Sequence, residues 1–465
     1  MLGSLVLLPF YTKVFTTSQF GSLSLLIGLT LLFQNIVSFS LDSYLAVHYH
    51  HYPEKSHQRS DLVASVFVLE IGIGLAFLLL MALAGGPLFG AIFDDPLVTY
   101  WKSGMMCVVT AISTAVIRSF FNLLIVRKDP KRYIWWNLAF AVVGVVLSLV
   151  FLFRMPGDVN GPLVGRLLTG IVFLVLIYIY ELKFPKVFNR ELMHGWLKFT
   201  WPIVVMTLSA WALTYVNPYI INEIMDSREV GVYTFLLSLM FAIEFAQTGL
   251  ASPLNARIYE ARSVSGGVSN EERSIHQVYS MLNIIAVAGA VAVLPWLSVF
   301  ITDKPDYLES LFLVPLFALG YSWRGIYNMA FTVAMFEKNT RSIMINSVVS
   351  SIFQVVLTIA LAKTAGLVGA VISFSVARTI QGVMMEWRTN AQNKIGINKW
   401  KINLVPAIFS VLLLGIYLLM KYEAGWWAPW ALMLLTFLAF ATWYRRDVVA
   451  VLVRISPKGK IFKKG

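Results

Sequence analysis

Charged residues are scarce in this chain of 465 residues. Asp, Glu, Lys and Arg make up 13% of the sequence, whereas hydrophobic residues make up 58% and the mean hydropathy is +0.73. A soluble domain has about 25% charged and 45–50% apolar residues. The composition therefore excludes an ordinary soluble domain and predicts an all-α polytopic membrane protein. The apolar runs are too long for barrel strands, which alternate over about ten residues.

Other absences limit the kinds of reaction and binding site that this sequence can support. The only cysteine is Cys107, so no disulfide can form within the chain. The sequence has no nucleophile motif, no phosphate-binding glycine loop and no nucleic-acid signature, and we expect no cofactor. Four histidines stand between two apolar runs, but no cysteine and few carboxylates accompany them, so we expect no metal site there. They are His48, His50, His51 and His57.

Fourteen apolar runs each approach the roughly 20 residues that a membrane-spanning helix needs. They fall at about 2–15, 19–41, 62–83, 104–126, 134–153, 162–182, 200–222, 230–254, 277–301, 308–335, 342–362, 365–386, 402–420 and 426–444. We therefore predict about 14 transmembrane helices. The first run has neither a charged start nor a small-residue cleavage site, which argues against a cleavable signal peptide.

Basic residues predict the orientation of these helices. The loops after even-numbered runs, together with the C-terminal tail, carry 26 of the 37 lysines and arginines, whereas the loops after odd-numbered runs carry seven. Because basic loops favour the cytoplasm, both termini are predicted to be cytoplasmic. The four remaining basic residues are arginines inside the fourth, sixth, tenth and twelfth runs, namely Arg118, Arg166, Arg324 and Arg378.

Several landmarks recur at a nearly constant spacing. Pro9 and Pro218 are 209 positions apart, and Gly21 and Gly231 are 210 apart. A shared order and offset favour an internal duplication. Six helices per half give both halves the same orientation, which predicts two six-helix bundles related by a pseudo-twofold axis along the membrane normal. The predicted domains are 1–195, 196–395 and a segment 396–465 with two additional helices and a basic cytoplasmic tail.

Two apolar runs contain the pattern Arg-x-x-x-Asn, as Arg118-Ser-Phe-Phe-Asn122 and Arg324-Gly-Ile-Tyr-Asn328. An arginine in hydrocarbon costs at least about 2.5–3.5 kcal/mol, and this spacing puts both polar groups on one helical face. Guanidinium groups match diphosphate oxygens bidentately, so the four arginines could line a cavity for an anionic lipid-linked substrate. Alternatively, each arginine braces two helices by pairing with a carboxylate or with backbone carbonyls. The two asparagines could likewise contact sugar hydroxyls or join helices.

Two acids and two prolines also lie inside apolar runs. Glu70 and Glu244 could each carry a proton, which an apolar environment favours, or serve as the counter-ion of an arginine. Pro9 and Pro218 each interrupt a predicted helix at matching positions and would permit a kink. The kinks would either act as gates between the halves or be static bends.

The segment 8–21 reads Leu-Pro-Phe-Tyr-Thr-Lys-Val-Phe-Thr-Thr-Ser-Gln-Phe-Gly. It resembles the start of Wzx-type polysaccharide flippases of the multidrug/oligosaccharidyl-lipid/polysaccharide (MOP) exporter superfamily. There, a proline–tyrosine pair in the first span precedes a short Ser/Thr-rich turn and an aromatic–glycine pair that opens the second. The helix count and the repeat extend the resemblance to the whole chain. One departure is Ser40-Leu41-Asp42, where a Gly-Leu-Asp turn is common.

The resemblance implies a V-shaped pair of bundles in the bacterial inner membrane. Such proteins carry an undecaprenyl-diphosphate-linked glycan, the repeat unit of O-antigen, capsule or exopolysaccharide, to the periplasmic leaflet by alternating access, and many are thought to couple this to an ion gradient. Membrane lipids, a polysaccharide polymerase and a chain-length regulator are candidate partners.

Two competing functions differ in their sequence requirements. A drug/cation antiporter of the same superfamily would bind organic cations through buried carboxylates, yet here four embedded arginines face two embedded glutamates. A membrane-embedded polysaccharide polymerase or glycosyltransferase would need a sizeable external loop, and the external connections here are short. The charges therefore favour an anionic substrate over an organic cation, and the short external connections argue against an enzyme.

Overall fold

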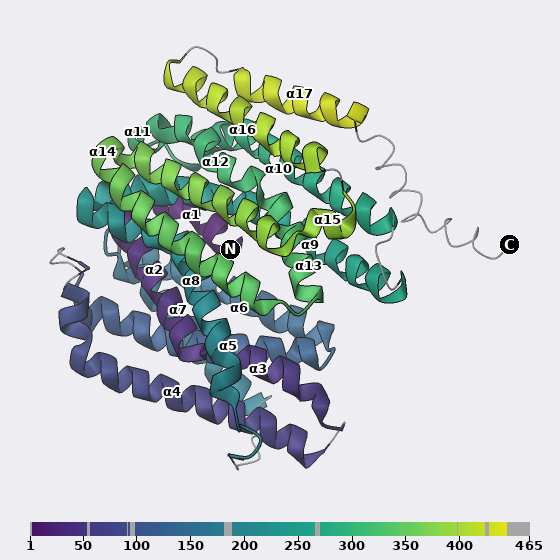
Figure 1. Ribbon diagram of the computed structural model, residues 1–465. Coiled ribbons are helices and arrows are strands. Elements are labelled where there is room, and N and C mark those ends of the chain that lie inside the picture. The colour runs from purple at the N-terminus through teal and green to yellow at the C-terminus, as the bar shows by residue number, and fades with distance from the viewer. Residues whose placement is uncertain are drawn as a thin grey trace. The chain divides into compact units, whose positions relative to one another are not determined.

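The computed structural model describes residues 2–53, 56–90, 92–93, 98–180, 188–265, 270–397, 399–423 and 427–443. Every regular element among these residues is helical (Figure 1). Most of the predicted basic tail, from residue 444 onward, lies outside the described residues.

The helices in the first part of the chain are α1 (Leu2–Val14), α2 (Thr17–Ser38), α3 (Leu41–His48), α4 (His57–Gly90), α5 (Met105–Val126), α6 (Pro130–Arg154), α7 (Asn160–Tyr180) and α8 (Trp196–Ile224). Those that follow are α9 (Ser227–Ser265), α10 (Asn270–Ile301), α11 (Pro305–Glu309), α12 (Val314–Ser322), α13 (Arg324–Phe336), α14 (Thr340–Thr389), α15 (Ala391–Ile395), α16 (Lys399–Lys421) and α17 (Ala428–Trp443). Three short segments with tighter or wider turns are η1 (Tyr49–His51), η2 (Tyr100–Gly104) and η3 (Ser310–Leu313).

Ten helices among the described residues are long and apolar enough to cross a membrane, and α1 is a shorter apolar helix. This confirms an all-α, multi-pass membrane protein. Helix α14 has 50 residues but breaks at Gly366, whose φ of 59° and ψ of −142° are not helical. The break lies just after the predicted boundary between the runs 342–362 and 365–386, where glycine tolerates a positive φ.

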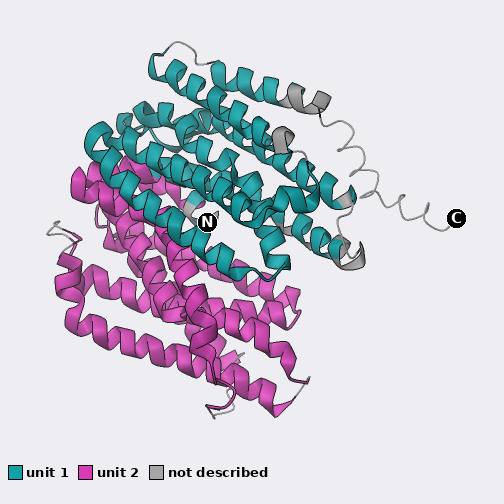
Figure 2. Cartoon of the chain, viewed as in Figure 1, with its two compact units in different colours: residues 1–5, 235–465 teal, residues 6–234 magenta. Residues whose placement is uncertain are grey.

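The chain divides into two compact units (Figure 2). Unit 2 comprises Val6–Thr234, and unit 1 comprises Met1–Leu5 together with Phe235–Gly465. Helices α1 and α9 therefore each contribute residues to both units. The predicted repeat boundaries at 195 and 395 concern the duplication, and they stay a prediction.

In unit 2, helix α5 packs against α2, α4 and α7, and α6 packs along α7. An apolar cluster from α3, α4, α5 and α7 includes Leu41, Phe67, Phe120 and Phe173, all nearly inaccessible to solvent. This cluster fixes α3 and α4 against α5, and so positions the polar groups that the same helices carry.

In unit 1, helix α14 packs against α12 and α13, and α10 contacts α12, α13 and α17. Helices α16 and α17 lie side by side at one edge of this unit (Figure 1). The run predicted at 308–335 is divided among α11, η3, α12 and α13, with a break at Trp323 directly before Arg324.

Helix α6 shows how the apolar surface is distributed. Ile134, Leu138, Val142, Val146 and Val150 follow one another at a four-residue spacing, and each is exposed by 40% or more. Residues four apart share one face of a helix. A continuous exposed apolar face of this length is suited to lipid rather than to water.

Candidate substrate and coupling sites

The first Arg-x-x-x-Asn motif belongs to a polar network inside unit 2. The Arg118 Nε atom lies 3.3 Å from Asp42 Oδ2, and Asn122 Nδ2 donates to the same oxygen at 2.7 Å. Arg118 Nη1 also donates to Asn35 Oδ1 at 3.3 Å. The Asp42 side chain is 3% exposed whereas that of Arg118 is 43% exposed. The carboxylate is therefore enclosed, while much of the guanidinium group is left accessible.

Local backbone geometry brings Asp42 to α5. Phe39 and Ser40, which separate α2 from α3, both have left-handed backbone conformations with φ of 44° and 56°. These conformations are uncommon outside glycine and asparagine. They turn the chain sharply, so that Asp42 in the first turn of α3 faces Arg118. In the sequence, Asp42 stood out only because Ser40-Leu41-Asp42 differs from the common Gly-Leu-Asp turn. Its pairing with Arg118 was not predicted.

Glu70 lies deeper in the same unit. Its side chain is inaccessible to solvent, and Ser119 Oγ donates to Oε1 at 3.0 Å. Its second oxygen, Oε2, has no hydrogen-bond partner among the residues that the structure describes. A buried unpaired charge costs several kcal/mol. Glu70 is thus a carboxyl group held by a single hydroxyl group rather than by an arginine.

The second motif belongs to unit 1 and has different partners. Arg324 Nη2 lies 3.1 Å from Glu244 Oε1, and the two side chains are 20% and 11% exposed. Asn328 donates a short hydrogen bond to the Tyr279 hydroxyl group. Glu244 is therefore placed as a counter-ion, whereas Glu70 is not. From the sequence, either glutamate could have been the counter-ion of an arginine. The structure shows this pairing for Glu244.

A neighbouring amide cluster stabilises the helix break before Arg324. Gln247 Nε2 donates to Asn283 Oδ1 at 2.6 Å, and Asn283 Nδ2 donates to the carbonyl groups of Tyr321 and Ser322 at 3.2 Å. Carbonyl groups at the end of a helix have no intrahelical partner. Asn283 satisfies two of them at the end of α12, which allows α13 to begin at Arg324. Sequence reasoning missed this cluster, because isolated amides in apolar helices carry no motif.

The other two embedded arginines are half-buried, one in each unit. Arg166 lies in α7 of unit 2, close enough to Tyr11 and Cys107 for its charge to act on both side chains. Arg378 lies in α14 of unit 1, where its guanidinium carbon is 5.3 Å from the centre of the Phe374 ring. A cation over an aromatic face gains about 0.5–2 kcal/mol. Neither arginine lies in the ion pairs described for Arg118 and Arg324.

The predicted gating prolines lie inside helices, Pro9 in α1 and Pro218 in α8. Around Pro218, the aromatic residues bind the protein backbone. Trp211 Nε1 donates to the Gly28 carbonyl at 2.9 Å, and the Tyr219 hydroxyl group donates to the Leu25 carbonyl at 2.7 Å. Both bonds brace α8 against α2, so the polar atoms of these two rings serve packing.

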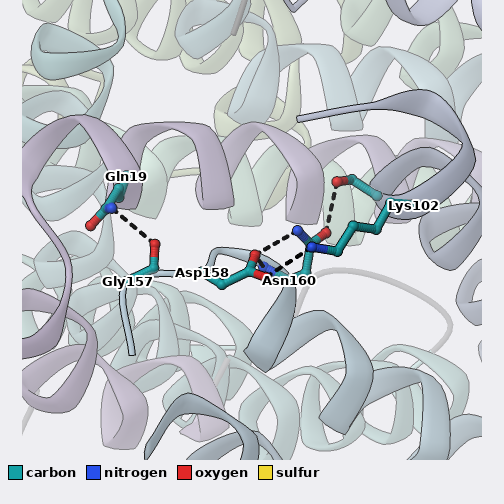
Figure 3. Close-up of polar contacts among 6 residues, drawn as sticks. Gln19, Lys102, Gly157, Asp158 and Asn160 are labelled. Carbon is teal, nitrogen blue, oxygen red and sulfur yellow. Dashed lines mark hydrogen bonds and ion pairs between the residues drawn. The ribbon is translucent and has the colours of Figure 1, made fainter. Parts of the chain in front are cut away.

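The segment 8–21, which resembles the start of Wzx-type flippases, contains the N-terminal cap of α2. The Thr16 hydroxyl group accepts from the Gln19 backbone N–H while the Gln19 side chain accepts from the Thr16 backbone, which is a reciprocal capping box. The Gln19 side-chain nitrogen also donates to the Gly157 carbonyl at 2.9 Å (Figure 3). Gly157 has a φ of 79°, a conformation that favours glycine. The Ser/Thr-rich turn therefore fixes the start of α2 and the connection between α6 and α7.

A second contact anchors the same connection to η2, the short segment directly before α5. Lys102 Nζ lies 2.9 Å from Asp158 Oδ2, and Asn160 donates to Asp158 Oδ1 through its backbone and its side chain (Figure 3). Burial alone would raise the pKa of Asp158, but the hydrogen bonds from Asn160 and Lys102 outweigh burial and hold the pKa below its ordinary value. Asp158 therefore stays ionised and holds the loop to Lys102 over the neutral pH range.

Helices α2 and α9 cross in close contact at their N-terminal ends, both within unit 2. A Cβ atom at Gly21 would lie 2.0 Å from the Ser227 carbonyl oxygen, and one at Gly231 would lie 2.0 Å from the Thr17 carbonyl oxygen. Gly21 and Gly231 are 210 positions apart, as are Thr17 and Ser227. Each helix thus makes the same contact with the other, as across a twofold axis.

Polar contacts flank this crossing. The Ser18 and Ser227 hydroxyl groups form a short hydrogen bond, and Ser24 Oγ lies 3.0 Å from Thr234 Oγ1. Small residues allow two helix backbones to approach closely, and hydroxyl groups then link them. Any larger side chain at either glycine would force the two helices apart.

Helix ends repeat at the same spacing of 210. Three pairs share a conformation or a capping role, namely the N-caps Thr16 and Asp226, the left-handed residues Lys128 and Lys338, and the N-caps Asp129 and Asn339. The spacing places Arg324 opposite Thr114 and Glu244 opposite Gln34. Gln34 contacts the Thr114 carbonyl at 3.5 Å, so the same pair of positions meets in both halves.

The same spacing places Arg118 opposite Asn328 rather than opposite Arg324. The two arginines are 206 positions apart, and the difference of four residues is one helical turn. They therefore lie on corresponding faces of α5 and α13 but one turn apart along the helix. The break before Arg324 is what places the second arginine at the start of its helix.

Comparison with known structures identifies the fold. The chain is similar to the lipid II flippase MurJ in its inward closed conformation, with a TM-score of 0.70 and 16% identity over 96% of this chain and 97% of that one. It is also similar to an inward-facing MATE-family multidrug transporter of the MOP superfamily, with a TM-score of 0.63 and 13% identity over 84% and 98% of the two chains. The fold is that of MOP-type membrane transporters.

The family follows from a separate comparison. The model of the family of polysaccharide biosynthesis proteins matches residues 1–256, which is more than half of the chain. The chain therefore belongs to that family, and the resemblance of its opening segment to Wzx-type flippases is confirmed. The family is one of transporters rather than enzymes. Comparison with curated protein sequences gives no match.

Proposed function

We propose that this protein moves an undecaprenyl-diphosphate-linked oligosaccharide, a repeat unit of O-antigen, capsule or exopolysaccharide, from the cytoplasmic to the periplasmic leaflet. The observation that carries the proposal is the family match over residues 1–256, which contains Arg118 and its polar network. The fold of a lipid II flippase supports the same class of substrate. Its location would be the bacterial inner membrane, where a polysaccharide polymerase and a chain-length regulator are candidate partners.

The proposed architecture has 14 membrane spans, with two six-helix repeats and two trailing helices. The constant spacing of 210 between helix caps supports the duplication, and the reciprocal contact between α2 and α9 supports a twofold relation between the repeats. Loop contacts support the orientation. Gln19, which directly follows the first connection, and Lys102 from the third connection both contact the fifth connection, at Gly157 and Asp158. Those are the connections that the basic residues predict to be external.

Arg118 and Arg324 are the proposed diphosphate contacts, with Arg166 and Arg378 as further cations along the path. A diphosphate carries about two negative charges and can bind a guanidinium group bidentately. The accessible part of Arg118 suits this role, since Asp42 occupies one edge of the group. Asn122 and Asn328 would orient the arginines or meet sugar hydroxyls. Asp42 and Glu244 keep each arginine paired when no substrate is present.

Glu70 is the proposed proton carrier. It is buried, lies in the same network of helices as Arg118, and has one oxygen without a hydrogen-bond partner among the described residues. Glu244 is instead paired with Arg324 and would couple ion movement only by releasing that arginine. The crossing of α2 and α9 is the proposed external gate, and bending at Pro9 and Pro218 would allow the helices around it to move.

Deletion of the gene followed by lipid extraction tests this function. The proposal predicts that the undecaprenyl-linked glycan accumulates and stays inaccessible to periplasmic enzymes, and that wild-type protein supplied in trans reverses this. Unchanged external glycan combined with increased sensitivity to cationic dyes would contradict the proposal and favour the drug/cation antiporter.

A further inference from the structure

A cavity of about 720 Å³ opens on unit 2, away from the arginines proposed to bind the transported substrate. It lies between η1 with the start of α4 on one side and the turn from α5 to α6 on the other. Its polar lining residues are His50, Ser56, His57, Arg59, Ser60, Arg127 and Lys128, and its apolar ones are Tyr49, Val63 and Val126.

The charged side chains among the residues that line the cavity are all positive. Arg59, Arg127 and Lys128 contribute three cations, and no carboxylate stands among the described residues that line the cavity. Two histidines and two serines add hydrogen-bond donors. Three cations that converge with no carboxylate among the described lining residues repel one another, and the arrangement gains stability when an anion enters. Phosphate oxygens suit these donors, because guanidinium groups bind them in pairs and ammonium groups as a point charge.

Arg59 is held in place rather than extended into solvent. Its Nε donates to the Tyr49 carbonyl at 3.1 Å and its Nη2 to the Tyr52 carbonyl at 2.7 Å. Its guanidinium carbon also lies 4.5 Å from the centre of the Tyr49 ring. The third nitrogen, Nη1, has no partner among the described residues. Fixing a guanidinium group in advance lowers the entropy that a bound anion must offset.

The opposite wall is held by the end of α5. Lys128 has a φ of 56°, and its N–H donates to the Ile125 carbonyl at 2.9 Å, while the Asp129 N–H donates to the Leu124 carbonyl at 3.0 Å. This left-handed turn closes the helix. It places Arg127 and Lys128 together in the wall of the cavity, on a segment whose backbone is hydrogen-bonded.

The surroundings favour a lipid as the source of the phosphate group. Val47 and Ile125 adjoin the lining segments and are 49% and 54% exposed. Both segments also belong to connections that the basic residues predict to be cytoplasmic. Basic groups beside exposed apolar side chains at a membrane surface attract anionic headgroups by about 1 kcal/mol per cation.

We infer that this cavity binds the phosphate or diphosphate group of a membrane lipid in the cytoplasmic leaflet. The inference stands apart from the proposed function, since none of the lining residues belongs to the proposed transport path. A free phosphate ester in the cytoplasm offers the same chemistry, so the experiment separates the two sources.

The test measures binding of inorganic pyrophosphate to the full-length protein by calorimetry. The double variant Arg127→Gln/Lys128→Asn removes two cations, and asparagine tolerates the left-handed conformation at 128. The control Lys131→Gln/Arg132→Gln removes two cations of the same region outside the cavity. We expect affinity at least tenfold weaker in the first variant than in the wild type or the control. Equal affinity in both variants, or no binding by the wild type, would overturn the site.

The second arm compares nanodiscs of phosphatidylcholine with nanodiscs containing phosphatidylglycerol. A lipid headgroup in the cavity competes with pyrophosphate, so we expect the apparent affinity of the wild type to fall when phosphatidylglycerol is present. In the Arg127→Gln/Lys128→Asn variant the lipid should make no further difference. An affinity that does not respond to the anionic lipid in the wild type would overturn the assignment to a lipid and leave a soluble phosphate ester.

Discussion

The ion pairs of Arg118 and Arg324 raise the main question at the scale of residues. Each arginine has an acid beside it, Asp42 or Glu244. This geometry satisfies the bracing role that the sequence left open, and it also leaves Arg118 partly accessible for an anion. Stability and transport must therefore be measured separately, because only transport distinguishes the two roles.

Arg118→Gln should destabilise the protein, because it leaves Asp42 enclosed without its cation. Breaking a buried pair costs about 3–5 kcal/mol, and since the Arg118 side chain is 43% exposed we expect a smaller loss of about 1–2 kcal/mol. The double variant Asp42→Asn/Arg118→Gln should regain most of that stability. Thermal unfolding in detergent measures both.

Glycan export should be lost in Arg118→Gln and should stay lost in the double variant, since neither retains the Arg118 cation, which is one of the two proposed diphosphate contacts. Export assayed in cells that express equal amounts of each variant checks this. If the double variant regained export together with stability, Arg118 would be a brace and not a substrate contact.

Glu70→Gln should remove proton coupling while preserving the fold. Glutamine keeps the shape of the side chain and can accept the hydrogen bond from Ser119, but it cannot carry a proton. We expect transport in vesicles to lose its dependence on an imposed proton gradient. The comparison variant Ser119→Ala removes the hydrogen bond and keeps the carboxyl group, so it should retain the dependence. A gradient effect as large in Glu70→Gln as in the wild type would remove Glu70 from the coupling.

At the scale of elements, the crossing of α2 and α9 is the contact that the proposed alternating access would break. It joins two equivalent helices through glycines and hydroxyl groups. Contacts of this kind can form and break as a unit. Two variants test the role of this crossing, one by locking the two helices together and the other by holding them apart.

The pair Ser18→Cys/Ser227→Cys should lock the crossing. The two hydroxyl groups are within hydrogen-bonding contact, and the native Cys107 is buried, so its interference is small and Cys107→Ala removes it altogether. Mild oxidation should form a cross-link that stops transport, and a reductant should restore it. Full transport by the cross-linked protein would contradict a gate at this place.

Gly21→Ala should hold the crossing apart. Its Cβ would lie 2.0 Å from a carbonyl oxygen, so the helices must separate, at a cost of about 1–3 kcal/mol. Gly72→Ala is the matched control, because nothing lies within 4 Å of its added Cβ and alanine is the better helix former. We expect a lower unfolding temperature and reduced transport for Gly21→Ala alone.

Prediction from the sequence succeeded where the signal is local. Membrane helices are apolar over their own length, and the break at Gly366 follows from a residue that permits it. The family was visible in the turn that caps α2, since the capping residues are contiguous. These features need no knowledge of which helices become neighbours.

Prediction fell short where two distant segments meet. The pairing of Asp42 with Arg118 depends on two left-handed residues between α2 and α3, and the carbonyl groups at the end of α12 are satisfied by Asn283 from another helix. The one-turn offset between Arg118 and Arg324 likewise depends on a helix break. Hydropathy along the sequence does not show which distant segments will contact one another.

At the scale of the whole molecule, the proposed function is the transfer of a lipid-linked glycan across the bilayer. The family, the fold and the ion pairs of Arg118 and Arg324 agree with it, and every role proposed for a residue of the transport path depends on it. A direct test needs only the purified chain, a membrane and the substrate.

The measurement is the fraction of a polyprenyl-diphosphate-linked oligosaccharide that becomes accessible to an external glycosidase in sealed proteoliposomes loaded with the lipid. Without protein, about half of a symmetrically inserted lipid should be cleaved and the rest protected. The account predicts that wild-type protein exposes the protected fraction within minutes, and that the oxidised Ser18→Cys/Ser227→Cys protein does not. Protection that persists with folded, correctly inserted wild-type protein under an imposed proton gradient of either direction would contradict the claim.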